Sequence, residues 1–302
     1  MDEKDCEILL TIFQEQNLSK AAERLYITQP ALTYRIRQLE KYFQFDIVQK
    51  EGKNIRFTPE GTHLVDYARK SLQEEQRFKE FITNLKTELQ GTLRLAASGH
   101  FTHYRMGPIL QQFLQMNPKV HIYLNTSINQ EIFQSLESNA IHVGIIRGTF
   151  NWVDRKHLIN EEPFYIISDK EIDIDDLPHL PRINYRPNTL PVNKFGYKPD
   201  TLLMEVIDGW WKDRYNVPSH ITINVNNYEI CKQLVSYGLG YSIVPELCLQ
   251  PQDRFFKHKV LFRSGEPLTR KTWLIYKESS LELNLVRQFV SFIESLELSK
   301  AD

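Results

Sequence analysis

The sequence predicts an α+β protein of several domains: a small helical head with a β-hairpin, one long helix, and a larger region of two α/β halves. Three observations lead to this prediction. The chain has 302 residues, about twice the usual length of one domain. Apolar residues before residue 90 recur at helical spacing. After residue 91, strand-like and helix-like segments alternate.

The composition excludes several classes of protein. With 41% hydrophobic and 25% charged residues, the chain is neither disordered nor fibrous. Its three cysteines have no Cys-x-x-Cys spacing, which fits a reducing compartment and predicts neither a disulfide framework nor a metal site. The first residues lack a signal-peptide pattern, and no apolar run could span a bilayer. We therefore expect a cytoplasmic protein with no membrane partner.

Positive charge is concentrated in one part of the chain. The net charge is −1, yet the segment from Lys20 to Arg56 holds eight basic residues against four acidic ones. A polyanion would therefore bind over a small footprint in this segment. An ordinary mixed surface could show a similar balance, so the charge alone does not establish nucleic-acid binding.

The head has the pattern of a helix-turn-helix. Apolar residues predict a helix over 4–16, and Ser19 can cap a second helix over 20–25. Thr28 suits the N-cap of a third helix that has Pro30 in its first turn. A motif that reads the DNA major groove consists of a short helix, a tight turn and a longer helix with a polar face. Other three-helix domains share this spacing.

A short β-hairpin follows the third helix. Residues 46–49 and 54–57 are strand-like and flank a turn in which Gly52 can adopt a positive φ. Such a hairpin is a wing, whose basic side chains can lie along a phosphate strand. The candidate DNA contacts in the helices and the wing are Ser19, Lys20, Thr28, Gln29, Pro30, Thr33, Tyr34, Arg35, Arg37, Lys50, Lys53 and Arg56.

The long helix begins at Thr58-Pro59-Glu60 and its pattern continues to about Leu89. A helix of this length would extend about 46 Å. Its apolar stripe is longer than the head can cover, and consists of Leu64, Ala68, Leu72, Phe78, Phe81, Ile82, Leu85 and Leu89. We expect the same helix of a second chain to cover it, in a homodimer or homotetramer. Packing on the chain's own C-terminal region is the alternative.

The region after Gly91 contains two series of alternating strands and helices, which are typical of βαβ units. The first series has strands over 93–97, 120–124 and 142–146 and helices over 105–116 and 130–138. The second has strands over 164–168, 182–185, 221–225, 241–244 and 271–276 and helices over 200–215, 228–237 and 282–296. Two similar lobes joined by crossing segments predict a hinged clamshell like that of the periplasmic binding proteins.

Four segments of the head resemble the N-terminal signature of the LysR-type transcriptional regulators: Leu18–Leu25, Thr28–Thr33, Ile36–Glu40 and Thr58–Gly61. The resemblance continues more weakly through the rest of the chain, at Val143–Arg147, Leu234–Gly240 and Ser242–Pro245. It implies three parts: a winged helix-turn-helix DNA-binding domain over 1–58, a linker and dimerisation helix over 59–90, and an effector-binding domain over 91–302. Within the last, lobe I would comprise about 91–162 and 268–302, and lobe II about 163–267. The implied partners are a double-stranded DNA operator and a small-molecule co-inducer, with RNA polymerase as a further candidate.

Ligands of open α/β sheets bind beyond the carboxyl ends of the strands. Polar residues at these places and on the returning segment are the candidate effector contacts: Ser98, His100, Thr102, Asn129, Arg147, Asn226 and Arg270. Arg270 could face Arg147 across the cleft, and two guanidinium groups would suit a carboxylate-bearing metabolite. The alternatives are that Ser98 caps a helix and that either arginine belongs to the surface.

Other functions have less support in the sequence. The α/β region could be a catalytic scaffold, but it lacks a Gly-x-Ser-x-Gly elbow, a phosphate loop and a His-Glu-x-x-His motif, so we expect neither an enzyme nor a bound cofactor. His100 and His103 lack a third ligand, and we expect no metal site. A protein-binding adaptor that uses the long helix would leave the basic wing unexplained.

Overall fold

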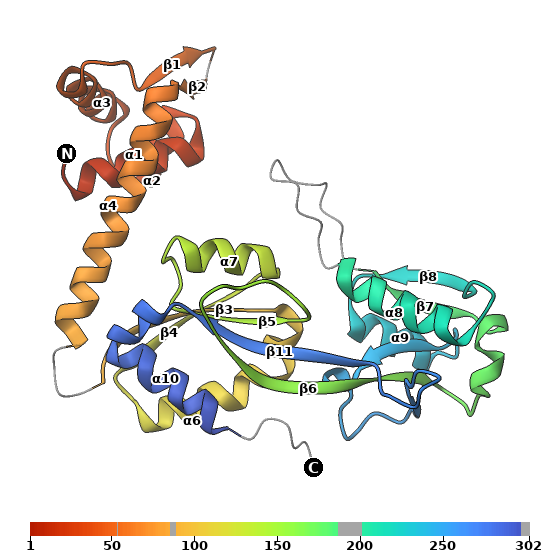
Figure 1. Ribbon diagram of the computed structural model, residues 1–302. Coiled ribbons are helices and arrows are strands. Elements are labelled where there is room, and N and C mark those ends of the chain that lie inside the picture. Colours follow the sequence, from red (N-terminus) through yellow and green to blue (C-terminus); the bar gives the residue numbers. More distant parts are fainter. Residues whose placement is uncertain (53, 85–88, 187–200, 297–302) are drawn as a thin grey trace. The chain divides into compact units, whose positions relative to one another are not determined.

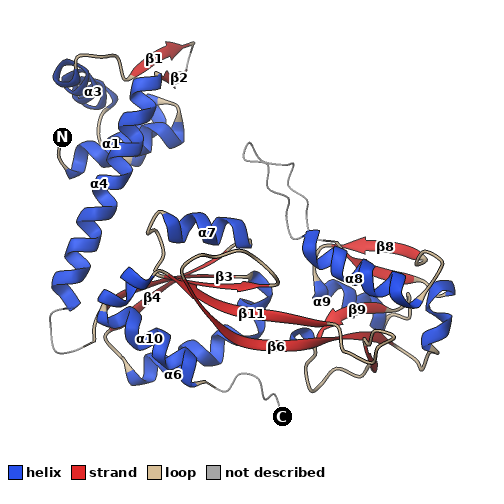
Figure 2. Cartoon of the chain, in the orientation of Figure 1, coloured by secondary structure: helices blue, strands red, loops and turns tan. Residues whose placement is uncertain are grey.

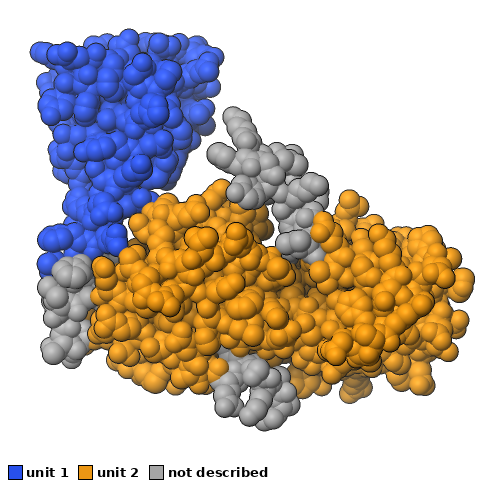
Figure 3. All heavy atoms as spheres, in the orientation of Figure 1, with its two compact units in different colours: residues 1–86 blue, residues 87–302 orange. Residues whose placement is uncertain are grey.

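The computed structural model describes residues 1–52, 54–84, 89–186 and 201–296. The chain divides into two compact units, residues 1–86 and 87–302 (Figures 1 and 3). Lys53 and Leu85, both named above as candidates, lie outside the described residues. Within the described residues, no helix has the length and apolar character needed to cross a membrane.

Unit 1 is a helical head with a β-hairpin and a long helix. Its elements are α1 (Glu3–Glu15), α2 (Leu18–Arg24), α3 (Gln29–Phe43), β1 (Val48–Glu51), β2 (Asn54–Phe57) and α4 (Pro59–Asn84). The Thr28 hydroxyl caps α3 as expected, by accepting the N–H of Ala31. The expected cap of α2 was wrong, because Asn17, not Ser19, accepts the first N–H groups of that helix.

The head closes around two small apolar clusters. Ala21 and Ala22 are fully buried and let α2 lie close to α3, while Leu9 and Leu39 join α1 and α3 to the start of α4. The wing strands β1 and β2 are antiparallel, and Gly52 in their turn has a φ of 65°. The first wing strand begins at Val48, two residues later than expected. The Ile47 carbonyl accepts the N–H of Thr58, which directly precedes α4.

The long helix α4 is covered by its own head over its first part only. Leu64 and Ala68 are buried in the head core, whereas Phe78 and Ile82 are 64% and 46% exposed. Leu89 differs from the expectation, since it is not helical and packs against the core of unit 2. The apolar stripe that needs a cover is therefore shorter than the sequence predicts.

Unit 2 contains the two α/β lobes. The elements of its first part are β3 (Gly91–Ala97), α5 (Gly99–Phe101), a π-helix (Thr102–Met106), α6 (Gly107–Met116), β4 (Val120–Thr126), α7 (Asn129–Glu137), β5 (Val143–Arg147) and β6 (Arg155–Ser168). They continue with β7 (Arg182–Tyr185), α8 (Thr201–Arg214), β8 (Ile221–Val225), α9 (Tyr228–Ser236), β9 (Ser242–Pro245), β10 (Phe256–Lys259), β11 (Thr269–Tyr276) and α10 (Asn284–Ser295). Short 3-10 turns lie at Ile174–His179, Glu246–Cys248 and Glu278–Glu282.

Strand β6 connects the two lobes. Its first part pairs with β11 and its last part with β9 and β10, so one strand belongs to both lobes (Figure 2). The sequence predicted only its apolar end, 164–168. The earlier residues were missed because Arg155, Lys156 and other polar side chains face solvent there, and their strand conformation depends on pairing with distant β11.

Each lobe has its own core. Strands β3 and β5 run parallel, and Leu95 and Val143 on these strands form one large cluster with Phe113 of α6 and Phe289 of α10. The second lobe is built around Trp210, Trp211 and Tyr241 on one side and Tyr228 and Cys231 on the other. The tryptophan pair belongs to this core, and both indole N–H groups donate to backbone carbonyls inside the lobe.

Candidate DNA-binding face and candidate effector site

The helix α3 exposes a polar face. Most of the candidate DNA contacts are exposed: Ser19, Lys20, Thr28, Gln29, Pro30, Tyr34, Arg37, Lys50 and Arg56. Thr33 is half-buried and accepts a hydrogen bond from the Gln29 side-chain amide at 3.2 Å, one helical turn away. A polar pair at the N-terminal end of a helix has the geometry needed to reach base edges.

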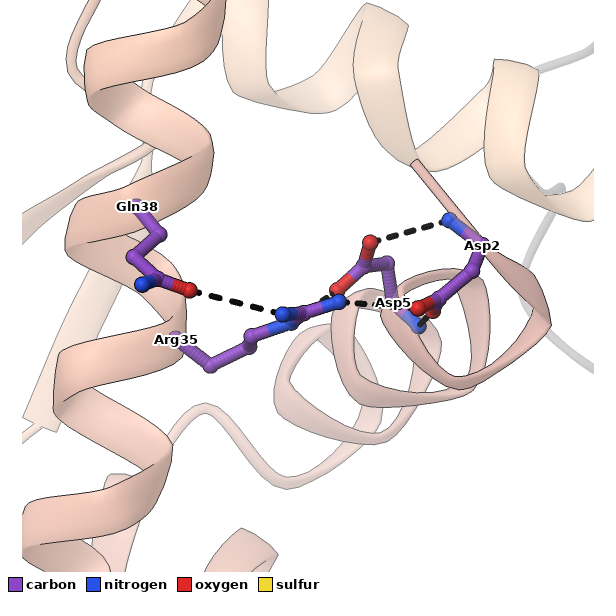
Figure 4. A network of polar contacts seen from close by, with 4 residues as sticks. All are labelled: Asp2, Asp5, Arg35 and Gln38. Carbon is purple, nitrogen blue, oxygen red and sulfur yellow. Dashed lines mark hydrogen bonds and ion pairs between the residues drawn. The ribbon is translucent and has the colours of Figure 1, made fainter.

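Arg35 lies on another side of α3. Its guanidinium binds Asp2 and Asp5 at the start of α1 and also reaches the side chain of Gln38 (Figure 4). Because helical residues are about 100° apart, Arg35 and Arg37 point to nearly opposite sides of the axis. The structure therefore separates Arg35 from the exposed candidates with which the sequence grouped it.

Tyr26, in the turn between α2 and α3, is a residue that the sequence reasoning missed. Its φ is 56°, a left-handed value that is unfavourable for a bulky residue, and its side chain is 96% exposed. In the sequence, the only indication of an unusual residue here was a tyrosine in the turn of the predicted helix-turn-helix. Backbone strain at an exposed aromatic residue marks a candidate functional position.

In unit 2, three buried charged residues and a threonine share one face of the sheet formed by β5, β11 and β6. Arg147 pairs with Thr272 in the strand register, and Arg270 pairs with Glu162. Paired residues and residues two apart on a strand share a face, so all four lie together. All four are buried. The two arginines thus lie on neighbouring strands, not across a cleft from each other as the sequence led us to expect.

Glu162 is the carboxylate of this cluster and was missed by the sequence reasoning. One oxygen pairs with the Arg147 guanidinium, and Oε2 accepts the N–H of Leu247 at 3.0 Å. The side chains of Arg147 and Glu162 are only 1% and 3% exposed. Leu247 follows β9 in the second lobe, so the carboxylate connects the two lobes.

His100 lies between this cluster and the second lobe. Its ring contacts Tyr228 and Tyr185, with centroids 4.8 Å and 5.6 Å away, and the two tyrosines stack at 3.9 Å. Burial, and then the positive charges of Arg147 and Arg270, lower the pKa of His100 to about 4. The imidazole is therefore neutral at pH 7, in a positive electrostatic potential.

Two hydroxyl groups near His100 have no hydrogen-bond partner within the described residues. One is Ser98 Oγ, at the N-cap position of α5, where it makes no capping bond. The other is the hydroxyl of Tyr228, a completely buried side chain whose burial raises its pKa well above the usual value. Capping therefore does not explain Ser98. Buried polar groups without partners are rare and mark places where a ligand or water binds.

The remaining effector candidates have other roles or lie at the surface. The Asn129 amide donates to the Arg147 carbonyl at 2.8 Å and holds the end of β5, and Thr102 donates to the Ser98 carbonyl at 3.1 Å. Asn226 is exposed. Among the described residues, no group of three or more His, Cys, Asp and Glu side chains is arranged to hold a metal ion.

A second polar cluster, also missed, joins the lobes near the first. The Tyr104 hydroxyl, from the π-helix, donates to Glu229 of α9. The buried Lys232 ammonium binds Asp253 at 2.9 Å, Glu229 at 3.2 Å and the Cys248 carbonyl at 2.8 Å. Such an interlobe network fixes how the lobes meet.

Comparisons with known proteins agree with this architecture. Residues 4–62 match the family described as bacterial regulatory helix-turn-helix protein, lysR family, and residues 86–297 match the LysR substrate binding domain. The chain is 38% identical over 294 residues to an uncharacterized HTH-type transcriptional regulator of Bacillus subtilis, YraN, covering 97% of this chain and 98% of the relative. A second Bacillus subtilis regulator, YkuM, is 31% identical and covers 98% of each chain.

The chain belongs to the LysR family. It is a DNA-binding transcriptional regulator with an effector-binding domain. Among solved structures, LysR-family CbnR in complex with its target DNA has a TM-score of 0.69 at 19% identity, with 97% of this chain and 99% of that chain covered. A full-length OxyR variant from Pseudomonas aeruginosa has a TM-score of 0.61 at 20% identity, with 99% of each chain covered. At these identities the likeness shows the fold alone.

Proposed function

We propose that this LysR-family regulator binds an anionic effector, expected to carry a carboxylate, between Ser98 and Tyr228 beside the buried arginines. The observation that carries the proposal is the completely buried Tyr228 hydroxyl, which has no hydrogen-bond partner within the described residues. An unsatisfied buried hydroxyl costs about 1–3 kcal/mol, which a bound acceptor would recover.

The charge of the ligand follows from the electrostatics around His100. Arg147 and Arg270 both disfavour the protonated form of that imidazole. They act in the same direction on Tyr228, where their charges favour the ionised phenolate against the effect of burial. A potential that disfavours a cation favours an anion at the same place. Guanidinium groups bind carboxylates in bidentate fashion, which favours a carboxylate-bearing ligand.

The effector would act by changing how the lobes meet. Tyr228 and Leu247 belong to the second lobe, whereas Ser98 directly follows β3 and Arg147 ends β5 in the first. A ligand held by both lobes binds their closed arrangement more tightly than an open one, and only this difference can shift DNA binding or contact with RNA polymerase.

A thermal-shift screen with mono- and dicarboxylates and with phosphorylated metabolites tests this proposal. We expect Tyr228→Phe and Ser98→Ala to retain their stability without ligand, because neither hydroxyl bonds to the protein, and to bind the identified anion about tenfold more weakly. The exposed Tyr237→Phe is the matched control. Undiminished binding to both variants in calorimetry would remove these hydroxyls from the site.

For the DNA-binding domain, we propose that the N-terminal end of α3 reads bases and that the wing contacts phosphates. We expect Gln29→Ala to lower discrimination at one operator position by about 1–3 kcal/mol. Arg56→Ala should weaken binding to all sequences alike and reduce the salt slope by about 0.9. Equal, sequence-independent losses from both changes would contradict the assignment of Gln29 to the major groove.

A further inference from the structure

We propose that Asp2, Asp5 and Arg35 form a clamp that positions α3 for DNA reading, and that Arg35 itself contacts neither bases nor phosphates. We call these three residues the α1–α3 clamp. These residues lie outside the exposed face of α3. The acidic side chains of Asp2 and Asp5 would thus contribute to DNA specificity without touching DNA.

The geometry of the clamp uses every nitrogen of the Arg35 side chain. Nε donates to Asp5 Oδ1 at 2.5 Å, one terminal nitrogen donates to Asp2 Oδ2 at 2.9 Å, and the other reaches the Gln38 side chain at 3.4 Å (Figure 4). A planar guanidinium held at three points has a fixed direction. Each nitrogen of Arg35 is thus bound to a side chain within the head, so Asp2 and Asp5 set the direction of the guanidinium.

The two carboxylates are themselves fixed at the start of α1. Asp2 accepts the N–H of Asp5, and Asp5 accepts the N–H of Asp2, each at 2.9 Å, in a reciprocal capping box. The Asp5 side chain is only 3% exposed. The clamp therefore connects the rigid first turn of α1 to the middle of α3, two elements 30 positions apart in the chain.

The position of Arg35 on α3 fits this role. Leu32, Ile36 and Leu39 form the buried side of the helix. At about 100° per residue, Arg35 lies at the edge of this buried side and nearly opposite Arg37. The clamp thus sets the rotation of α3 about its axis, and with it the direction in which Gln29 and Thr33 point.

The electrostatics of the three groups support a stable ion pair. Hydrogen bonding and charge from Asp5, then Asp2, raise the pKa of Arg35, and the backbone bond from Asp5 with the charge of Arg35 lowers the pKa of Asp2. Carboxylates near a polyanion ordinarily weaken its binding, so neutralising one should strengthen it. If the clamp positions α3, neutralising one of its carboxylates should instead weaken binding to the specific DNA sequence.

The test uses the full-length protein and two duplexes: one selected from a random library by the unmodified protein, and one of mixed sequence. We expect Asp5→Asn to weaken binding to the selected duplex about tenfold. Binding to the mixed-sequence duplex should stay unchanged or become tighter, because a negative charge is removed. Retained binding to the mixed-sequence duplex also shows that the head is folded. Asp2→Asn, which breaks only the more exposed arm, should give a smaller loss in the same direction.

Arg35→Gln and Arg37→Gln form the matched pair. Arg37→Gln should reduce the salt slope by about 0.9, whereas Arg35→Gln should leave the slope unchanged while lowering specificity. The double variant Asp5→Asn/Arg35→Gln should lose no more than Arg35→Gln alone, because that single change already removes the contact with Asp5. A reduced salt slope in Arg35→Gln, or tighter binding of Asp5→Asn to both duplexes, would overturn the proposal.

Discussion

Glu162 of β6 forms a buried ion pair with Arg147 at the end of β5, and its second oxygen accepts the Leu247 N–H from the other lobe. This one carboxylate therefore pairs with one of the two buried arginines and also connects the lobes. A buried pair of this kind contributes little net free energy, but removal of one partner leaves the other charged and buried.

We expect Arg147→Ala to destabilise unit 2 by about 3–5 kcal/mol, because it leaves the Glu162 carboxylate unpaired. Adding Glu162→Gln should restore much of this loss, since Gln still accepts the Leu247 N–H without a charge. Urea denaturation of the two single variants and the double variant measures the coupling. The exposed pair Arg155 and Glu278 is the control, and Arg155→Ala should have a far smaller effect. Additive losses from Arg147 and Glu162 would contradict the pairing.

His100 predicts a loss of stability in acid. Well above pH 6.5 the imidazole is neutral in both the folded and the unfolded protein. Between pH 6.5 and about 4, only the unfolded protein binds the proton, so the free energy of unfolding falls as the pH falls through this window. Denaturation at a series of pH values should show a flatter dependence for His100→Gln than for the unmodified protein. An unchanged dependence in His100→Gln would refute this prediction.

Because the backbone of Tyr26 is strained, we expect a substitution there to increase stability and weaken DNA binding. Its left-handed backbone costs about 1–2 kcal/mol, and asparagine tolerates this conformation better. Tyr26→Asn should therefore raise the melting temperature of the head, while loss of the exposed ring should weaken binding to the selected duplex. Tyr42→Asn, at another exposed tyrosine that lies within the helix α3, should not stabilise the protein. A lower melting temperature for Tyr26→Asn would contradict the inference that the backbone of Tyr26 is strained.

The exposed apolar residues of α4 indicate that this helix joins two copies of the chain. Phe78 and Ile82 lie on one side of the helix, where exposed apolar surface is unfavourable by about 25 cal/mol per Å². Phe78→Glu with Ile82→Glu should dissociate a homodimer or homotetramer and weaken operator binding, as seen by ultracentrifugation and DNA titration. Gln76→Glu, on the opposite side of the helix, is the control. A monomeric unmodified protein would refute the proposed role of α4 in assembly.

The sequence by itself determined the elements whose signals are local. The first two helices of the head, the Thr28 cap, the Gly52 turn and the alternation of strands and helices after residue 91 all follow from neighbouring residues, because caps, turns and periodic burial act over a few positions. Four short head motifs were enough to predict the LysR family. Ser98 and Arg147 were chosen as effector candidates in the same way, as polar residues directly after predicted apolar strands, and their role in binding stays a prediction.

Only the tertiary structure decided which polar side chains meet. Arg35 binds Asp5, 30 positions away, and Tyr104 binds Glu229, 125 positions away. Nothing near these residues in the sequence distinguishes them from solvated charges. Glu162 and the polar half of β6 were missed for the same reason, since their burial and strand conformation come from pairing with β11 more than a hundred residues later. A charged side chain becomes structural or functional when folding removes its water and supplies a partner, and both depend on long-range contacts.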